Sequence, residues 1–107
     1  MSEESGSAQY EFEIGQVIHH KRYHYRGVIF GRDQTCQGDE AWYQKNQTQP
    51  DRDQPWYHVM VDGAEHTTYV AQSNLEPDET GEPVNHPLLG QFFKSLHQGR
   101  YYAENLN

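Results

Sequence analysis

A chain of 107 residues has the length of one domain, so we expect a single hydrophobic core. Only 34% of the residues are apolar, whereas 13% are aromatic, with eight Tyr and two Trp. This balance favours a β-sheet core over a Leu-rich helical bundle. The net charge of −8 argues against non-specific binding to nucleic acid, and the single cysteine, Cys36, excludes an intramolecular disulfide or a multi-cysteine metal cluster.

Residues 1–9 are acidic and polar, with no apolar stretch. We expect them to form a disordered tail ahead of one domain over 10–107, because they resemble neither a secretory signal nor a transit peptide. No apolar run approaches the roughly 20 residues that span a bilayer. The sequence therefore predicts a cytoplasmic protein with no membrane contact.

Two strands are predicted in the first third of the chain. Apolar residues recur at near-alternate positions from Phe12 to Ile18, which indicates a first strand, and residues 25–33 form the second. Gly27 and Gly31 bracket three apolar residues, and glycines inside a strand often mark a bulge or a tight bend. This spacing suits a small, strongly curved barrel.

The middle of the chain predicts a long loop and a hairpin. Residues 34–55 are polar and too long for a tight turn, and Trp42 and Tyr43 interrupt them. A third strand is predicted over 56–61, with apolar side chains on both of its faces. We therefore expect both faces to be partly covered. Asp62-Gly63 is a strong hairpin signal, and a fourth strand over 67–71 follows.

The C-terminal third is predicted to change from strand to helix. Residues 76–85 form an acidic linker with two prolines. Apolar residues then recur with helical spacing from Leu88 to Leu96, with Pro87 suited to the first turn and Gly99 to the end. The sequence predicts a mainly β fold with one helix over about 87–97.

The sequence offers little support for catalysis or for a bound metal. His19 and His20 would point to opposite faces of a strand, so at most one could join His24 at a common ion. His58 and His66 flank the predicted hairpin turn and could face each other across it. No nucleophile motif or glycine-rich phosphate loop occurs, and no signature flanks Cys36. We expect no enzyme activity, cofactor or metal.

The charges and aromatics point instead to binding. The acid-free stretch 14–32 carries +4 while the rest of the chain carries −12. It is either a solvated basic hairpin or a patch for a polyanion or an acidic peptide. The Trp and Tyr content exceeds what a small barrel needs inside. The candidate partner-binding residues are Lys21, Arg22, Tyr23, Arg26, Arg32, Trp56 and Tyr57.

Four blocks resemble a known family: GQVIHHKRYHYRGVIFGRD from Gly15, Thr35-Cys36, PWYHVMVDG from Pro55 and TYVAQSNLE from Thr68. They are similar to the YccV-like domain, named for binding hemimethylated DNA and found in the heat shock protein HspQ. The domain also occurs at the C-terminal end of an F-box protein, in a longer version than in HspQ. The segment HPLLGQFF from His86 is similar to that longer version. The resemblance spans about residues 12–102.

The resemblance implies an SH3-like β-barrel without catalysis and two kinds of role. One is an adaptor or specificity factor in protein quality control that serves a Lon-type ATP-dependent protease. The other is binding to hemimethylated DNA. Four clustered cations in an acidic chain favour the adaptor role, since phosphate contacts need Lys and Arg. A structural module of a larger complex is a third alternative, and homo-oligomerisation is left open.

Overall fold

The computed structural model describes residues 9–46 and 48–104. The predicted tail therefore lies outside the described residues, except for the exposed Gln9. No helix in the described ranges is long and apolar enough to cross a membrane. The elements are β1 (Val17–His20), β2 (Arg26–Asp33), α1 (Glu40–Gln44), β3 (Trp56–Val61), β4 (Thr67–Ala71), the 3₁₀ turn η1 (Gln72–Asn74), β5 (Leu75–Pro77), α2 (Leu89–Phe92), β6 (Ser95–His97) and β7 (Arg100–Tyr102).

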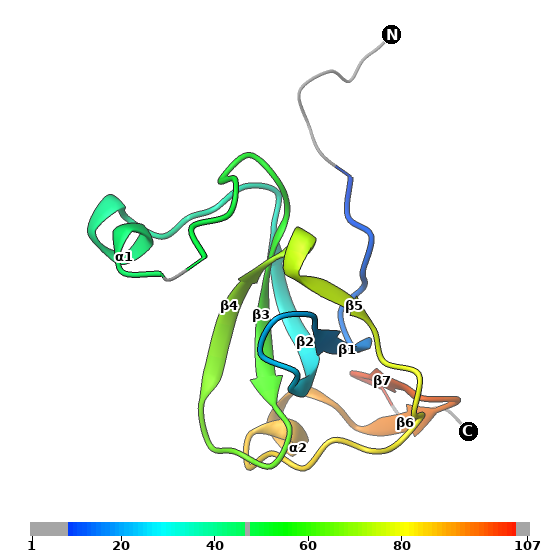
Figure 1. Cartoon of the computed structure of the whole chain (residues 1–107). Coiled ribbons are helices and arrows are strands. Elements are labelled where there is room, and N and C mark those ends of the chain that lie inside the picture. The colour runs from blue at the N-terminus through cyan, green and yellow to red at the C-terminus, as the bar shows by residue number, and fades with distance from the viewer. Residues whose placement is uncertain (1–8, 47, 105–107) are drawn as a thin grey trace, which may run out of the picture.

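The strands form two antiparallel sheets, which confirms the predicted mainly β class (Figure 1). The larger sheet has the order β4-β3-β2-β1-β5, so β4 and β5 are its edges, and β6 and β7 form a separate hairpin. The ribbon in Figure 1 shows this sheet strongly curved. No pairing joins β4 to β5 in the described part of the chain, and closure into a barrel stays a prediction.

An extra residue in β2 contributes to this curvature. Ile29 pairs with Val59, but Gly31 pairs with His58, so Phe30 is the inserted residue of a bulge. Of the two possibilities that the strand glycines indicated, a bulge or a tight bend, the register shows the bulge. A bulge increases the local twist and bends the strand that carries it.

Both faces of the central strands are buried, as the pattern of β3 predicted. Two clusters of buried residues cover these faces, and a third lies beside the long loop that connects β2 to β3. The first contains Phe12, Ile18, Ile29, Tyr57, Val59, Val70 and Leu75; the second contains Val17, Val28, Met60, Val84, Phe93 and Tyr101; the third contains Cys36, Trp56 and Ala71.

The predicted long loop over 34–55 holds one short helix, α1, which stands out from the sheet in Figure 1. Asp39 caps this helix, because its Oδ1 accepts a hydrogen bond from the Trp42 N–H at 2.8 Å. The Trp42 ring packs edge-on against Trp56 at a centroid distance of 5.9 Å. This contact and a second one between Trp42 and Tyr69 hold α1 near the beginning of β3.

The first strand is shorter than predicted, and a later strand was missed. β1 begins at Val17, because Gly15 has a φ of +93° and turns the chain before it. Residues 75–77, predicted partly as linker, form β5 and pair with β1. The hairpin after β3 does turn at Gly63, with a φ of +79°, although its loop is longer than the two residues of a tight hairpin.

The predicted helix over about 87–97 is wrong beyond Phe92. Phe93 is extended, and β6 and β7 form a hairpin whose turn residues Gln98 and Gly99 both have positive φ. Long-range contacts override the helical pattern, since the buried Phe93 belongs to the same core cluster as Val28 and Met60. Its ring also packs against Tyr101 of β7 at 5.8 Å. Phe92 and Leu96, from the predicted apolar stripe, remain 42% exposed.

Candidate functional site

The predicted basic segment forms a turn that is held together from inside. The turn between β1 and β2 closes with the His20 N–H donating to the Tyr25 carbonyl at 2.8 Å. The buried His20 Nδ1 also accepts the backbone N–H groups of Arg22 at 3.1 Å and Tyr23 at 3.0 Å. Lys21 N–H donates to the Asn74 carbonyl, which ties the turn to η1. The side chains of Lys21, Arg22 and Tyr23 are left exposed.

The other two predicted cations are engaged within the chain. Arg26 donates to Asp78 at 2.9 Å and to Asp62 at 2.9 Å, and it also reaches the Glu82 carbonyl at 2.6 Å. Arg32 donates to the Phe12 carbonyl at 3.0 Å and lies over the Tyr10 ring.

The ion pair with Asp78 is largely shielded, because its carboxylate is only 4% exposed. Hydrogen bonds to Asp78 raise the pKa of Arg26. Burial acts to raise the pKa of Asp78, but the hydrogen bonds from Arg26 and Thr80 outweigh it and lower that pKa overall. Both groups are therefore charged at neutral pH.

Trp56 and Tyr57 are buried, which corrects their predicted place on an accessible surface. Trp56 is 1% and Tyr57 0% exposed. The physical reason is the position of β3, which lies between β2 and β4 and is covered on both faces. The Tyr57 hydroxyl donates to Gln72 and accepts from the Phe12 N–H, so its polar end is also satisfied inside the fold.

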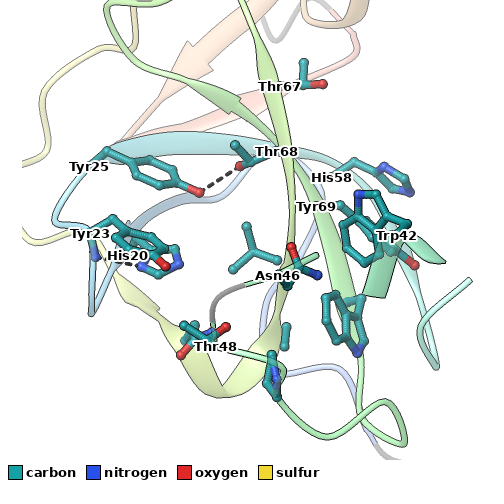
Figure 2. Close-up of a pocket in the computed structure, with 15 residues that line it drawn as sticks. His20, Tyr23, Tyr25, Trp42, Asn46, Thr48, His58, Thr67, Thr68 and Tyr69 are labelled. Carbon is teal, nitrogen blue, oxygen red and sulfur yellow. Dashed lines mark hydrogen bonds between the residues drawn. The ribbon is translucent and has the colours of Figure 1, made fainter. Parts of the chain in front are cut away.

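A groove of about 430 Å³ runs beside β4 (Figure 2). Its lining combines residues of the β1–β2 turn, four residues between 42 and 50, two residues of β3 and the whole of β4. None of the described residues that line it is Asp, Glu, Lys or Arg, although the chain has 24 of these. The lining residues are His20, Tyr23, Tyr25, Trp42, Asn46, Thr48, Pro50, Trp56, His58, Thr67, Thr68, Tyr69, Val70, Ala71 and Asn74.

One wall of the groove is a stack of aromatic rings. Tyr69 lies against His58 at 4.5 Å and against Trp42 at 5.5 Å between ring centroids. The Tyr69 hydroxyl donates to Asp33 at 2.7 Å and accepts the Gln37 N–H at 3.0 Å. Burial and the hydrogen bond to the Asp33 carboxylate raise the pKa of Tyr69, so it is a neutral donor. This wall is therefore built of aromatic rings that contact one another.

The opposite wall comes from the β1–β2 turn, as Figure 2 shows. The His20 ring lies between Tyr23 at 4.8 Å and Tyr25 at 5.1 Å. The Tyr25 hydroxyl forms a 2.7 Å hydrogen bond with the Thr68 hydroxyl of β4. Burial, followed by the nearby His19, His24 and Arg22, lowers the pKa of His20. Its neutral form is the one that can accept the two turn N–H groups.

The histidines do not form a metal site among the described residues. No group of three metal-ligating side chains occurs in residues 9–46 and 48–104. His19 bonds to Glu76 at 2.8 Å, and its ring lies 5.5 Å from that of His24. His58 and His66 do not face each other across the hairpin, because the register places His58 opposite Tyr69. The His66 carbonyl instead lies 3.0 Å from His86 Nε2.

The sequence prediction thus included only part of the groove lining. Of the candidate site residues, Tyr23 and the buried Trp56 line the groove, and Lys21 and Arg22 stand next to lining residues in the sequence. Trp42, Tyr69 and Tyr25 were not among the candidate site residues. The excess of aromatics was the signal for them. The number of aromatic residues could not show which rings lie in the core and which line the groove, since Tyr101, another of these aromatics, is buried.

Comparison with known proteins identifies the domain. Residues 10–100 match the family described as "Hemimethylated DNA-binding protein YccV like". The chain is 34% identical to the mouse (Mus musculus) protein F-box only protein 21, over 97 residues that make up 88% of this chain and 15% of that protein. It is 33% identical to the human (Homo sapiens) and orangutan (Pongo abelii) proteins of the same name, with the same coverage. It spans about one seventh of the length of these relatives. The chain belongs to the YccV-like family.

Proposed function

We propose that this chain is a non-catalytic protein-recognition domain that acts as an adaptor in protein quality control, as in the HspQ-like role. The observation that carries this proposal is the groove beside β4, which is lined by aromatic and small polar side chains and by no charged group among the described residues. Recognition sites for proteins are enriched in Tyr and Trp. Similarity to F-box proteins, which also carry this domain, supports a role in protein interaction.

The distribution of cations further favours a protein partner over DNA. Four of the eight Lys and Arg side chains bond to other groups of the chain: Arg26, Arg32, Arg52 and Arg100. The four exposed ones are Lys21, Arg22, Lys45 and Lys94. Proteins that bind duplex DNA commonly neutralise about six to ten phosphates. A molecule of net charge −8 with four exposed cations is poorly suited to that.

Binding to hemimethylated DNA is the second candidate, because the family description names it and Lys21 and Arg22 lie together on the β1–β2 turn. In this case the exposed Tyr23 ring would stack on a base while the cations contact phosphates. Such binding is expected to be weak and strongly dependent on salt.

Two parallel measurements separate these candidates. The first titrates a fluorescent hemimethylated duplex and its unmethylated counterpart at about 0.15 M salt, where we expect dissociation constants weaker than about 10 µM and similar for both. The second is affinity capture from a nuclease-treated lysate of the source organism. We expect the wild type to retain defined proteins, including a component of the proteolytic machinery.

The matched controls are Tyr23→Ala at the groove and Leu96→Ala, another exposed apolar side chain away from the groove lining. Capture should be lost with the first and kept with the second. Submicromolar binding to the hemimethylated duplex, with at least tenfold preference over the unmethylated one, would overturn the proposal in favour of DNA.

A further inference from the structure

β4 is an edge strand with unpaired backbone groups. It pairs only with β3, and the hydrogen bonds that flank the pair join Val61 N–H to the His66 carbonyl and Gln72 N–H to the Pro55 carbonyl. Antiparallel ladders alternate between bonded and non-bonded pairs, so Thr67 and Tyr69 occupy non-bonded positions. Their N–H and C=O groups point away from β3. No hydrogen bond to these four groups occurs within the described residues.

The groove follows this edge. All five residues of β4 line it, although successive side chains of a strand point to opposite faces. A groove that touches every residue in turn must therefore run along the side of the strand. The aromatic side chains of the β1–β2 turn and of α1 rise on its two flanks (Figure 2). An occupant lying there meets main-chain donors and acceptors at a two-residue spacing, with rings to either side.

The charges around the groove define the chemistry of the occupant. The interior is uncharged among the described lining residues, whereas Lys21 and Arg22 are adjacent to the lining residues His20 and Tyr23. At the other flank, the exposed Lys45 precedes the lining residue Asn46. These three cations have no ion-pair partner among the described residues. One exposed acid, Asp51, also follows a lining residue, Pro50. In a chain with twice as many acids as bases, three exposed cations against this one acid favour an acidic ligand.

The geometry points to strand addition: β4 binds an extended segment of a partner protein, with apolar or aromatic side chains at its centre and acidic residues at its ends. This inference rests on the proposed protein-recognition function and specifies its ligand. The peptide main chain pairs with Thr67 and Tyr69. Its alternate side chains contact the Tyr23–Tyr25 wall and the Trp42–Tyr69 wall, and its terminal acids meet Lys21, Arg22 and Lys45.

The test begins with selection of binders from a phage-displayed library of random eight-residue peptides. We expect enriched sequences with a central aromatic or branched aliphatic pair and flanking Asp or Glu. The strongest peptide is then synthesised with each backbone amide N-methylated in turn. Methylation at alternate positions, where the N–H faces β4, should weaken binding at least tenfold. Methylation at the intervening positions should change it less than threefold.

Variants of the protein test the same contact from the other side. Thr67→Pro removes one outward N–H at the first position of an edge strand, where proline is tolerated. Thr67→Val keeps that N–H and the side-chain volume. The first should lose at least tenfold in peptide affinity and the second less than threefold, with both retaining the wild-type circular dichroism spectrum. If Thr67→Pro fails to fold, the N-methylated peptides still test main-chain pairing with β4, because they are measured against the wild-type protein.

The outcomes separate this inference from the proposed function. If peptides are enriched but bind with no alternation in the N-methyl series, strand addition is wrong while protein recognition stands. If no peptide is enriched and hemimethylated duplex binds instead, both are wrong. If no peptide is enriched and sedimentation shows a dimer that Thr67→Pro dissociates, the edge pairs with a second copy and the inference is overturned.

Discussion

At the scale of single residues, nearby cations in the basic stretch differ in whether the fold leaves them exposed or pairs them with acids. Arg22 is exposed on the turn, whereas Arg26, only four residues later, is enclosed by two carboxylates and a carbonyl. The difference arises because β2 begins at Arg26 and brings its side chain against Asp62 and Asp78. Arg26 thus connects the β3–β4 loop to the segment after β5.

Replacing Arg26 with Ala should lower the free energy of unfolding by about 3 kcal/mol, because it leaves the buried Asp78 carboxylate without its partner. Arg22→Ala is the matched control and should change it by less than about 0.5 kcal/mol. Urea denaturation monitored by tryptophan fluorescence measures both. Equal effects of the two substitutions would show that the Arg26 network adds nothing to stability.

His20 makes the turn sensitive to acid. Its folded-state pKa is lowered by burial and by His19, His24 and Arg22, while the unfolded pKa is about 6.5. As pH falls below about 6.5, His20 takes up a proton in the unfolded state before it does so in the folded state. The contribution of neutral His20 to the free energy of unfolding is therefore complete above this pH and is lost as pH falls toward the folded-state pKa. We expect an NMR titration of His20 to give a midpoint below 6.5. His20→Asn should flatten the pH dependence of unfolding between pH 7.5 and 5.5, whereas the exposed His97→Gln should not. A His20 midpoint at or above 6.5 contradicts this account.

At the scale of elements, Gly15 joins the first sheet to the C-terminal hairpin. Its N–H donates to the Ile29 carbonyl at 2.7 Å, and its carbonyl accepts the Tyr101 N–H at 2.8 Å. A Cβ at this position would collide with the Tyr101 carbonyl oxygen. The approach of β7 to the core therefore depends on a residue without a side chain.

Gly15→Ala should lower the free energy of unfolding by about 3 kcal/mol, from the left-handed backbone and the collision together. Gly81→Ala provides the comparison, because Gly81 has a φ of +73° but open space around it, and should cost about 1 kcal/mol. Urea midpoints of the two variants give the difference. If they are equally destabilised, the contact with Tyr101 does not constrain position 15.

At the scale of the whole molecule, charge is segregated in space. The acid-free stretch contributes two exposed cations, Lys21 and Arg22, beside the groove, while the chain as a whole carries −8. A local positive region on an acidic molecule attracts an acidic ligand over about a Debye length and repels it elsewhere. This arrangement affects the rate of association more than the final affinity.

The double variant Lys21→Ala/Arg22→Ala should slow association with the selected acidic peptide several-fold at low salt and leave dissociation nearly unchanged. The difference in association rate between the wild type and the double variant should shrink near 1 M salt, where the Debye length is about 3 Å. Stopped-flow fluorescence measures both rates, and Lys94→Ala controls for loss of an exposed cation elsewhere. If DNA were the partner, the salt slope would fall by roughly one per lost phosphate contact. Unchanged kinetics at every salt concentration would show that the turn is only a solvated loop.

The local pattern of the sequence determined the mainly β class, the central strands, the bulge in β2 and the exposed basic turn. These depend on side-chain alternation and on glycine, which act over a few residues. The tertiary structure alone decided that Arg26 meets Asp78, that β5 pairs with β1 and that residues 95–102 form a hairpin. It also buried Trp56 and Tyr57 and placed Trp42 opposite the β1–β2 turn, because packing of distant segments selects which aromatic rings are core and which line the groove.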